Sequence, residues 1–188
     1  MGSGPGAQPG KQSPGEQSMT ADGVSGNSPV NQGRFRTTSA DRMRILQTYK
    51  RIAMVGLSSN PFRPSHFAAI YLMSNGYDVT PVNPREKEIL GRRSYASLSE
   101  VPGPLEIVDI FREPSAVPAI VDEAIARGAK VIWMQLGVIH EEAAEKARQA
   151  GLEVVMDRCV KIEHARFFGG LSTIGLNTGV ISAQRRNH

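Results

Sequence analysis

Residues 55–66, VGLSSNPFRPSH, combine side chains and spacing that suit the binding of an anion. An apolar segment runs into a polar turn, and Pro64 marks the first position of a helix that follows. The hydroxyls of Ser58 and Ser59 and the guanidinium of Arg63 lie beside that helix N-terminus, where free N–H groups and the helix dipole attract phosphate. Capping of the helix by the turn side chains is an alternative use of the same groups, and the two uses are compatible.

The turn holds one glycine, Gly56, where a dinucleotide-binding fingerprint holds three. A nicotinamide-binding domain also carries an acid at the end of its second strand, which binds the ribose hydroxyls. Here residues 82–85 read VNPR, without an acid. Arg85 would tolerate a ribose phosphate, so an NADP-binding interaction module stays open as an alternative. The two departures together favour a phosphorylated adenine ligand of another kind.

The elements that must position these side chains alternate regularly from residue 51 onward. Strands are predicted at 51–56, 77–82, 106–111, 130–135 and 152–156, a short edge strand or turn at 94–98, and helices at 64–75, from about 114 to 128 and from about 140 to 150. Apolar strands with helices between them are typical of a parallel sheet covered on both faces. We therefore predict an α/β, Rossmann-like, doubly wound fold with a mostly parallel sheet in one domain.

Parallel strands end at one edge of their sheet, so the residues that follow each predicted strand come together there. These segments are 56–60, 83–85, 112–114, 136–137 and 157–159. Loops are polar in most proteins, so the pattern alone does not separate a ligand site from ordinary loops. The chemistry of the turn after the first strand makes this edge the candidate site.

The first 33 residues are rich in Gly, Ser, Pro, Gln and Asn, without an aromatic residue, which predicts a disordered tail at 1–33. The rest of the chain carries a net charge of +5, against +4 for the whole chain, because the tail holds one lysine and two acids. A basic domain suits an anionic ligand, although a merely soluble surface fits as well, and no basic stripe predicts nucleic-acid binding. No apolar segment predicts a secretion signal or a membrane span, so we expect a soluble, cytoplasmic protein.

The sequence resembles the stand-alone CoA-binding protein family in several stretches. These are VGLSSNPFRPSH, VTPVNP with EILGRRSYASLSEVP, VDIFREPSAVPAIVDEAIARGAKVIWMQLGV and VVMDRCVKIEH, followed by the extension GGLSTIGLNTGVISAQRR. The stretches occur in order and at suitable spacing, and the likeness defines an expected domain at 40–186. That family is similar in turn to the CoA-binding Rossmann domain of succinyl-CoA synthetase alpha subunits and ADP-forming acyl-CoA synthetases.

The resemblance implies coenzyme A or an acyl-CoA as the ligand. The pyrophosphate would lie on the turn after the first strand, the adenine and ribose phosphate near the end of the second, and the pantetheine arm along the ends of the next two. The implied binding residues are Gly56, Ser58, Ser59, Asn60, Arg63, Pro64, Ser65, Val82, Asn83, Pro84, Arg85, Phe111, Arg112, Pro114, Gln135, Gly137 and Cys159.

The related synthetases carry a phosphorylated catalytic histidine on a second domain and work with an ATP-grasp partner, and this sequence shows neither. Its four histidines have no metal-ligand spacing, and no two carboxylates are spaced for acid–base chemistry. We expect a non-catalytic or regulatory CoA-binding protein, with a homo-oligomer or an acyl-CoA enzyme as partner. The alternative is one subunit of an acyl-CoA ligase or transferase whose catalytic domain lies on another chain, so enzymatic activity stays open.

The single cysteine, Cys159, rules out an intramolecular disulfide and a cysteine-based zinc site. It lies between Arg158 and Lys161, before a predicted helical turn, so the cations and the helix N-terminus are expected to lower the pKa of its thiol. Such a thiol would form a redox-dependent mixed disulfide with CoA. A buried, inert thiol is the alternative.

Overall fold

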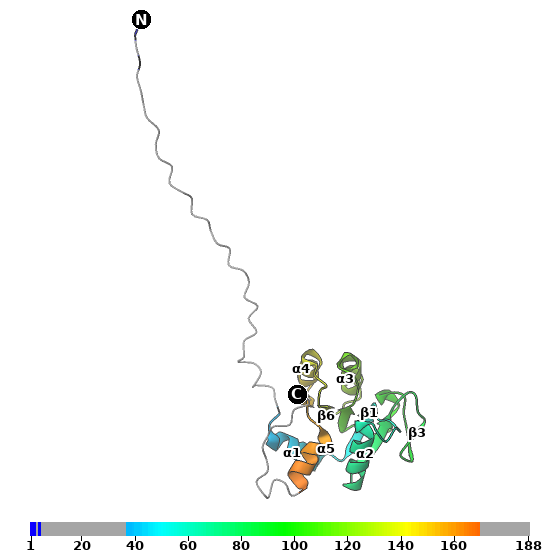
Figure 1. Ribbon diagram of the computed structural model, residues 1–188. Coiled ribbons are helices and arrows are strands. Elements are labelled where there is room, and N and C mark those ends of the chain that lie inside the picture. The colour runs from blue at the N-terminus through cyan, green and yellow to red at the C-terminus, as the bar shows by residue number, and fades with distance from the viewer. Residues whose placement is uncertain (3, 5–36, 170–188) are drawn as a thin grey trace, which may run out of the picture.

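The structure, a computed structural model, describes residues 1, 2, 4 and 37–169. Most of the tail predicted at 1–33 lies outside the described residues, and so does the extension after residue 169. Figure 1 shows residues 37–169 as one layered α/β unit. No helix within residues 37–169 is long and apolar enough to cross a membrane.

A sheet of five strands forms the centre of the unit, and every pair of neighbouring strands in it is parallel. The strands are β1 (Arg51–Val55), β2 (Asp78–Val82), β5 (Ile107–Ile110), β6 (Val131–Met134) and β7 (Glu153–Val155), in the order β2-β1-β5-β6-β7. The Rossmann-like fold predicted from the alternation of strands and helices is confirmed.

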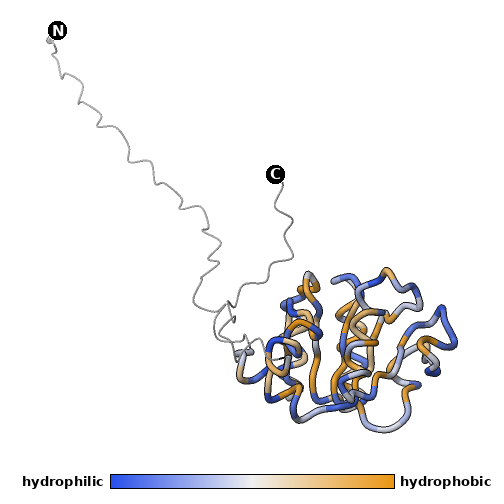
Figure 2. The backbone as a smooth tube through the Cα atoms, turned by 60° about the horizontal axis from the view of Figure 1, so that its bottom comes forward, coloured by the Kyte–Doolittle hydropathy of each residue, from blue (hydrophilic) through white to orange (hydrophobic). Residues whose placement is uncertain are grey.

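Helices cover both faces of the sheet (Figure 1). On one face lie α1 (Ser39–Thr48), α2 (Pro64–Ser74) and α5 (Val160–Phe168), and on the other lie α3 (Val117–Ala126), which a short 3-10 turn at Pro114–Ala116 precedes, and α4 (Glu141–Gln149). Alternate strand residues point to opposite faces, so Ile52 and Met54 pack under α1 and α2 while Ala53 and Val55 pack under α3 and α4. Figure 2 shows that the apolar segments concentrate in the interior and the hydrophilic ones in the outer loops.

The strand order reverses between β1 and β5. The chain leaves β1 through α2 to reach β2 on one side, and leaves β5 through α3 to reach β6 on the other. The two strands are direct neighbours, with Val55 opposite Ile110. Because the connections diverge here, the carboxyl ends of β1 and β5 mark the place at which open α/β sheets bind their ligands. We refer to this expected binding position between the two strand ends as the crevice.

Helix α1 and the strands β3 and β4 were not predicted from the sequence, and neither was a 3-10 turn at Leu98–Glu100. Helix α1 precedes the first strand, and its N-terminus carries a capping box in which the Asp41 N–H donates to Thr38 Oγ1 at 3.2 Å and the Thr38 N–H donates to Asp41 Oδ2 at 2.8 Å. Strands β3 (Glu88–Ile89) and β4 (Arg92–Arg93) form a small antiparallel hairpin. In the segment 94–98, predicted as an edge strand or turn, only Tyr95 pairs with the sheet, through an isolated bridge to Val82.

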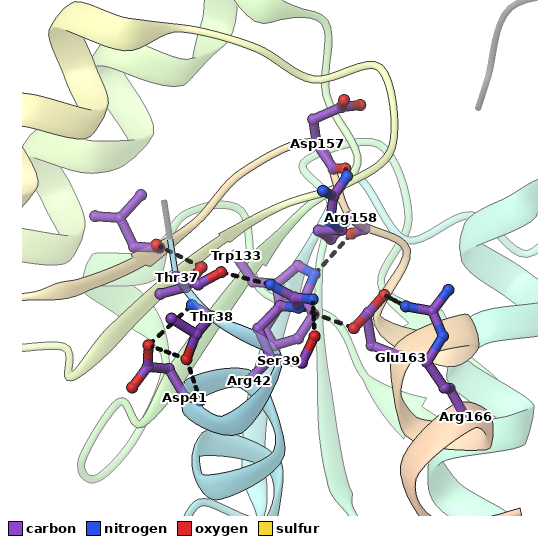
Figure 3. Close-up of polar contacts among 11 residues, drawn as sticks. Thr37, Thr38, Ser39, Asp41, Arg42, Trp133, Asp157, Arg158, Glu163 and Arg166 are labelled. Atoms are coloured by element: carbon purple, nitrogen blue, oxygen red, sulfur yellow. Dashed lines mark hydrogen bonds and ion pairs between the residues drawn. The ribbon is translucent and has the colours of Figure 1, made fainter. Parts of the chain in front are cut away.

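A buried charge cluster fastens α1 to α5 (Figure 3). The Glu163 carboxylate binds Arg42 Nε at 2.8 Å and Arg166 at 3.0 Å, and the side chains of all three residues are at most one-tenth exposed. The Arg42 guanidinium also donates to the Thr37 carbonyl and, at 3.0 Å, to Ser39 Oγ. One carboxylate is therefore the shared counter-ion of two buried guanidinium groups.

We expect Glu163→Ala to lower the free energy of unfolding by about 3–5 kcal/mol, because it leaves two arginines buried without their counter-charge. The matched control is Glu153→Ala, which removes a carboxylate from a more exposed pair with Arg44 and should cost about 1 kcal/mol or less. Urea denaturation of the three proteins measures both values. Equal losses in the two variants would show that the Glu163 cluster contributes no more than a surface pair.

Candidate functional site

The turn after β1 passes against the end of β5 at Gly56. The Gly56 N–H donates to the Val82 carbonyl at 2.9 Å, which ties the turn to β2 as well. Its φ is +88°, and a Cβ at this position would lie 2.9 Å from Arg112 Cδ and 3.1 Å from the Phe111 carbonyl oxygen. Only glycine meets both conditions, so the turn can pass this close to the end of β5. The ends of β1, β2 and β5 lie together because β1 pairs with both of the other strands.

The turn side chains bond within the turn and do not cap α2. The Asn60 N–H donates to Ser58 Oγ at 3.2 Å, and the Phe62 N–H donates to Asn60 Oδ1 at 2.9 Å. Arg63 occupies the N-cap position of α2 and makes no side-chain capping bond. The alternative that the serines and Asn60 serve as helix caps is therefore wrong, and the N-terminus of α2 begins without a side-chain cap beside an exposed Arg63.

His66 and Ser65 brace the turn from the first residues of α2. A ring nitrogen of His66, Nδ1, lies 2.9 Å from the Ser58 carbonyl oxygen, and the Ser58 N–H donates to Ser65 Oγ at 3.3 Å. Ser65 is buried, so its hydroxyl holds the backbone from within. These contacts give both residues a positioning role in the turn.

Asn83 connects the loop after β2 to the turn after β1. Its Nδ2 donates to the Leu57 carbonyl at 2.9 Å, and its Oδ1 accepts from the Arg85 N–H at 2.9 Å. Its own N–H donates to the Tyr95 carbonyl at 2.8 Å. One half-buried amide thereby fixes the relative positions of two loops at the crevice.

The loop after β2 does bring an acid to the turn after β1. This acid is Glu86, which lies one residue beyond the segment 82–85 in which the sequence shows none. Glu86 Oε1 accepts from the Ser59 N–H at 3.3 Å and from Asn83 Nδ2 at 3.2 Å. The side chain is half-buried. The only signal in the sequence is an acid four residues beyond the last residue of β2, on a loop whose return to the site the sequence does not show.

Arg63 and Arg85 lie at this edge, and neither makes an ion pair with another described residue. Arg112 is different, because its guanidinium donates to both carboxylate oxygens of Glu113, at 3.0 and 3.3 Å. That hydrogen bond lowers the pKa of the Glu113 carboxyl, and the charge of Arg85 acts in the same direction. The charge of Arg85, in the loop after β2, therefore acts on the Glu113 carboxyl in the segment after β5.

The predicted site residues differ in how far they reach the surface. Exposed at this edge are Ser59, Asn60, Arg63, Pro64, Pro84, Arg85, Pro114 and Gly137; half-buried are Gly56, Ser58, Asn83, Phe111, Arg112 and Cys159; buried are Ser65, Val82 and Gln135. The turns after β1, β2 and β5 form one continuous group. The segments after β6 and β7 form a second group, in which the Gly137 N–H donates to Asp157 Oδ1 at 2.8 Å and Asp157 adopts a left-handed φ of 56°.

Gln135 does not present its amide at the surface. Its Nε2 donates to Asp109 Oδ1 at 2.6 Å, and its Oε1 accepts from the Val160 N–H at 3.4 Å. The amide therefore links the interior of β5 to the start of α5. Of the three residues, Gln135 is 4% exposed and Asp109 and Val160 are fully buried.

Asp109 is a buried acid that the sequence placed in a strand without assigning it a role. Its Oδ2 is buried and has no hydrogen-bond partner within the described residues. Burial raises the pKa of this carboxyl to about 7, against the opposing effect of the Gln135 hydrogen bond. The signal available in the sequence is one acid in the otherwise apolar segment IVDIF.

The expectation of a lowered thiol pKa at Cys159 is wrong. Cys159 does stand at the N-terminus of α5, as predicted. Burial nevertheless raises the pKa of the thiol, outweighing the backbone N–H groups of Ile162 and Lys161 and the charge of Lys161. Desolvation disfavours the thiolate more than the helix N-terminus favours it.

A parallel sheet with helices on both faces and a close glycine turn where the strand order reverses defines a Rossmann-like domain. The chain belongs to the CoA binding domain family, whose match covers residues 50–165.

Relatives of known sequence or structure have the same domain. The uncharacterized protein YneT of Bacillus subtilis is 41% identical over 128 residues, which are 68% of this chain and 95% of YneT. A solved protein from Pyrococcus horikoshii is 40% identical with a TM-score of 0.70, over 78% of this chain and 100% of that one. The alpha subunit of ADP-forming acetate–CoA ligase II from Pyrococcus furiosus is 29% identical over 122 residues, 59% of this chain and 27% of the subunit.

We expect Asp109 to contribute a fall in the free energy of unfolding as the pH rises from about 4 to about 7. The folded protein retains a proton up to a pKa of about 7, whereas the unfolded chain releases it near 3.8, so the slope from this group approaches about 1.4 kcal/mol per pH unit. Asp109→Asn should flatten the dependence in that window, measured by urea denaturation at several pH values.

Asp122→Asn is the control, because Asp122 is an exposed acid paired with Lys146. It should leave the slope between pH 4 and 7 unchanged. If Asp109→Asn and Asp122→Asn behave alike, Asp109 does not hold its proton in the folded state.

Proposed function

We propose that this protein binds coenzyme A or an acyl-CoA at the carboxyl edge of its sheet and acts as a non-catalytic or regulatory binding protein. The observation that carries the proposal is the turn at Gly56, which crosses the end of β5 where a Cβ would clash and leads to an uncapped helix N-terminus beside Arg63. Such a turn offers backbone donors and a full positive charge to a phosphate.

The residues around the turn fit the other parts of the ligand. Arg63 and the start of α2 would hold the pyrophosphate, and Asn83 and Arg85 would face the adenosine and its ribose phosphate. Phe111 is half-buried at the end of β5 and offers an apolar wall for the pantetheine arm. CoA, when bound, supplies the thiol at the end of that arm. Gln135 would act indirectly by fixing the strand ends, since its side-chain amide bonds to Asp109 and Val160 in the interior.

The comparisons with known proteins support the proposal independently of the geometry of the turn. The matching family is described as a CoA binding domain, and the archaeal relatives are named as acetate–CoA ligases. This chain spans only about a quarter of the Pyrococcus furiosus subunit. The same comparison therefore supports the alternative that it acts as one subunit beside a separate catalytic chain.

Arg63→Ala should weaken CoA binding by about 1.5–3 kcal/mol, roughly 10- to 150-fold in dissociation constant, because it removes a charged hydrogen-bond donor from the pyrophosphate. Isothermal titration calorimetry measures the change. Lys130→Ala is the control, since Lys130 is an exposed cation that precedes β6 at the opposite edge of the sheet. An equal effect of the two variants would show that Arg63 acts only through net charge, and no effect would remove it from the site.

The alternatives have distinct outcomes. Tighter binding of NADP than of CoA would favour a nucleotide-binding interaction module. A subunit of an acyl-CoA ligase would be favoured if the protein co-purifies with an ATP-grasp protein and if ligase activity requires both chains. Native mass spectrometry of the purified protein identifies the small molecule released on denaturation and so separates coenzyme A from NADP, whereas the co-purification separates a ligase subunit from a stand-alone binding protein.

A mixed disulfide between Cys159 and CoA is a separate part of the proposal. The protein thiol would attack CoA disulfide, forming one protein–CoA disulfide and releasing one CoA thiol. Because burial raises the pKa of Cys159, the adduct should form slowly at neutral pH and faster as the pH rises. Intact-mass measurement should show one adduct, reversed by dithiothreitol and absent from Cys159→Ser. If the wild-type protein gains no adduct even at high pH, the mixed disulfide is ruled out and only non-covalent binding of CoA remains proposed.

A further inference from the structure

A carboxylate of the chain itself occupies the turn to which a phosphate is assigned. Glu86 Oε1 lies 3.3 Å from the Ser59 nitrogen and accepts its N–H. The same oxygen lies 3.2 Å from Asn83 Nδ2, the amide that joins the loops after β1 and β2. A carboxylate of the chain is therefore bonded to a backbone donor of the turn.

A phosphate and this carboxylate cannot share the Ser59 N–H. Both carry negative charge, and two anions a few ångströms apart repel each other unless a cation lies between them. A backbone N–H donates one strong hydrogen bond, so a ligand oxygen that takes it must replace the carboxylate oxygen. Binding at this turn is then an exchange of one anion for another.

The loop that carries Glu86 is built to allow such an exchange. Glu86 follows Arg85 directly, and Arg85 is exposed while Glu86 is half-buried. The loop is anchored at Asn83, whose Oδ1 accepts the Arg85 N–H and whose carbonyl accepts the Glu86 N–H at 3.4 Å. Withdrawal of the carboxylate requires a change in one side chain only, and the anchor stays in place.

We propose that the Glu86 carboxylate competes with the ligand for the turn after β1, at residues 56–63. It accepts the Ser59 N–H until a phosphate of the ligand displaces it. The proposal rests on the proposed function and concerns the regulation and selectivity of the same site. A ligand with a diphosphate compensates for the displaced carboxylate, whereas an uncharged ligand of similar shape does not. Glu86 therefore selects diphosphate-bearing ligands and limits their affinity.

The test compares Glu86→Gln and Glu86→Ala with Glu88→Gln. Glu88 is an exposed acid two residues further on, in β3, so the control removes the same charge without a contact to the turn. Calorimetry with CoA and with inorganic pyrophosphate should show about five- to twentyfold tighter binding by both Glu86 variants, and a change below about twofold for Glu88→Gln. Thermal unfolding of each variant confirms that the fold is intact.

The outcomes separate the two proposals. Unchanged affinity in the Glu86 variants overturns the competitor role, and weaker binding overturns it in favour of a direct bond from Glu86 to the ligand, such as to a ribose hydroxyl. If CoA does not bind but pyrophosphate binds more tightly to the Glu86 variants, the competitor role stands and the assignment of CoA fails. If neither probe binds to any of the proteins, both proposals fail.

Discussion

The backbone after β1 crosses the end of β5 at a point where a single side-chain carbon would collide with Phe111 and Arg112. On the other side of β1, the Gly56 N–H donates to the Val82 carbonyl and so continues the parallel pairing of β1 with β2. The contacts between the loops after β1 and β2 depend on that pairing. Asn83 can bond to Leu57, and Glu86 to Ser59, only because the two loops are held side by side.

Two carboxyls are buried within residues 37–169, and their surroundings differ in charge. Glu163 is surrounded by two guanidinium groups and serves as the negative centre between α1 and α5. Asp109 has one amide as its partner and no cation, so burial raises its pKa to about 7 and the proton stays bound in mildly acidic solution. Burial alone does not decide the charge of a carboxyl, since the partners supplied by neighbouring elements decide it.

Local pattern explains why most of the fold could be predicted. Each central strand is a short apolar run between turns, and Pro64 and Gly76 frame α2. Helix α1 was missed because it precedes the first strand and no apolar periodicity marks it. The contacts of Glu86 and Gln135 come from how loops and strands pack, which a linear pattern does not contain. The direction of the Cys159 pKa shift was predicted wrongly for a similar reason, because desolvation of the thiol depends on neighbours distant in sequence.

Both outer strands of the sheet are partly occupied by the chain itself. Along β2, the Tyr95 N–H donates to the Pro81 carbonyl and the Tyr95 carbonyl accepts the Asn83 N–H, while Pro81 has no N–H to offer. Along β7, Thr37 Oγ1 donates to the Val154 carbonyl at 3.4 Å. A second molecule that tried to extend the sheet by adding a strand would first have to break these bonds, so the short edges are protected against edge-to-edge aggregation.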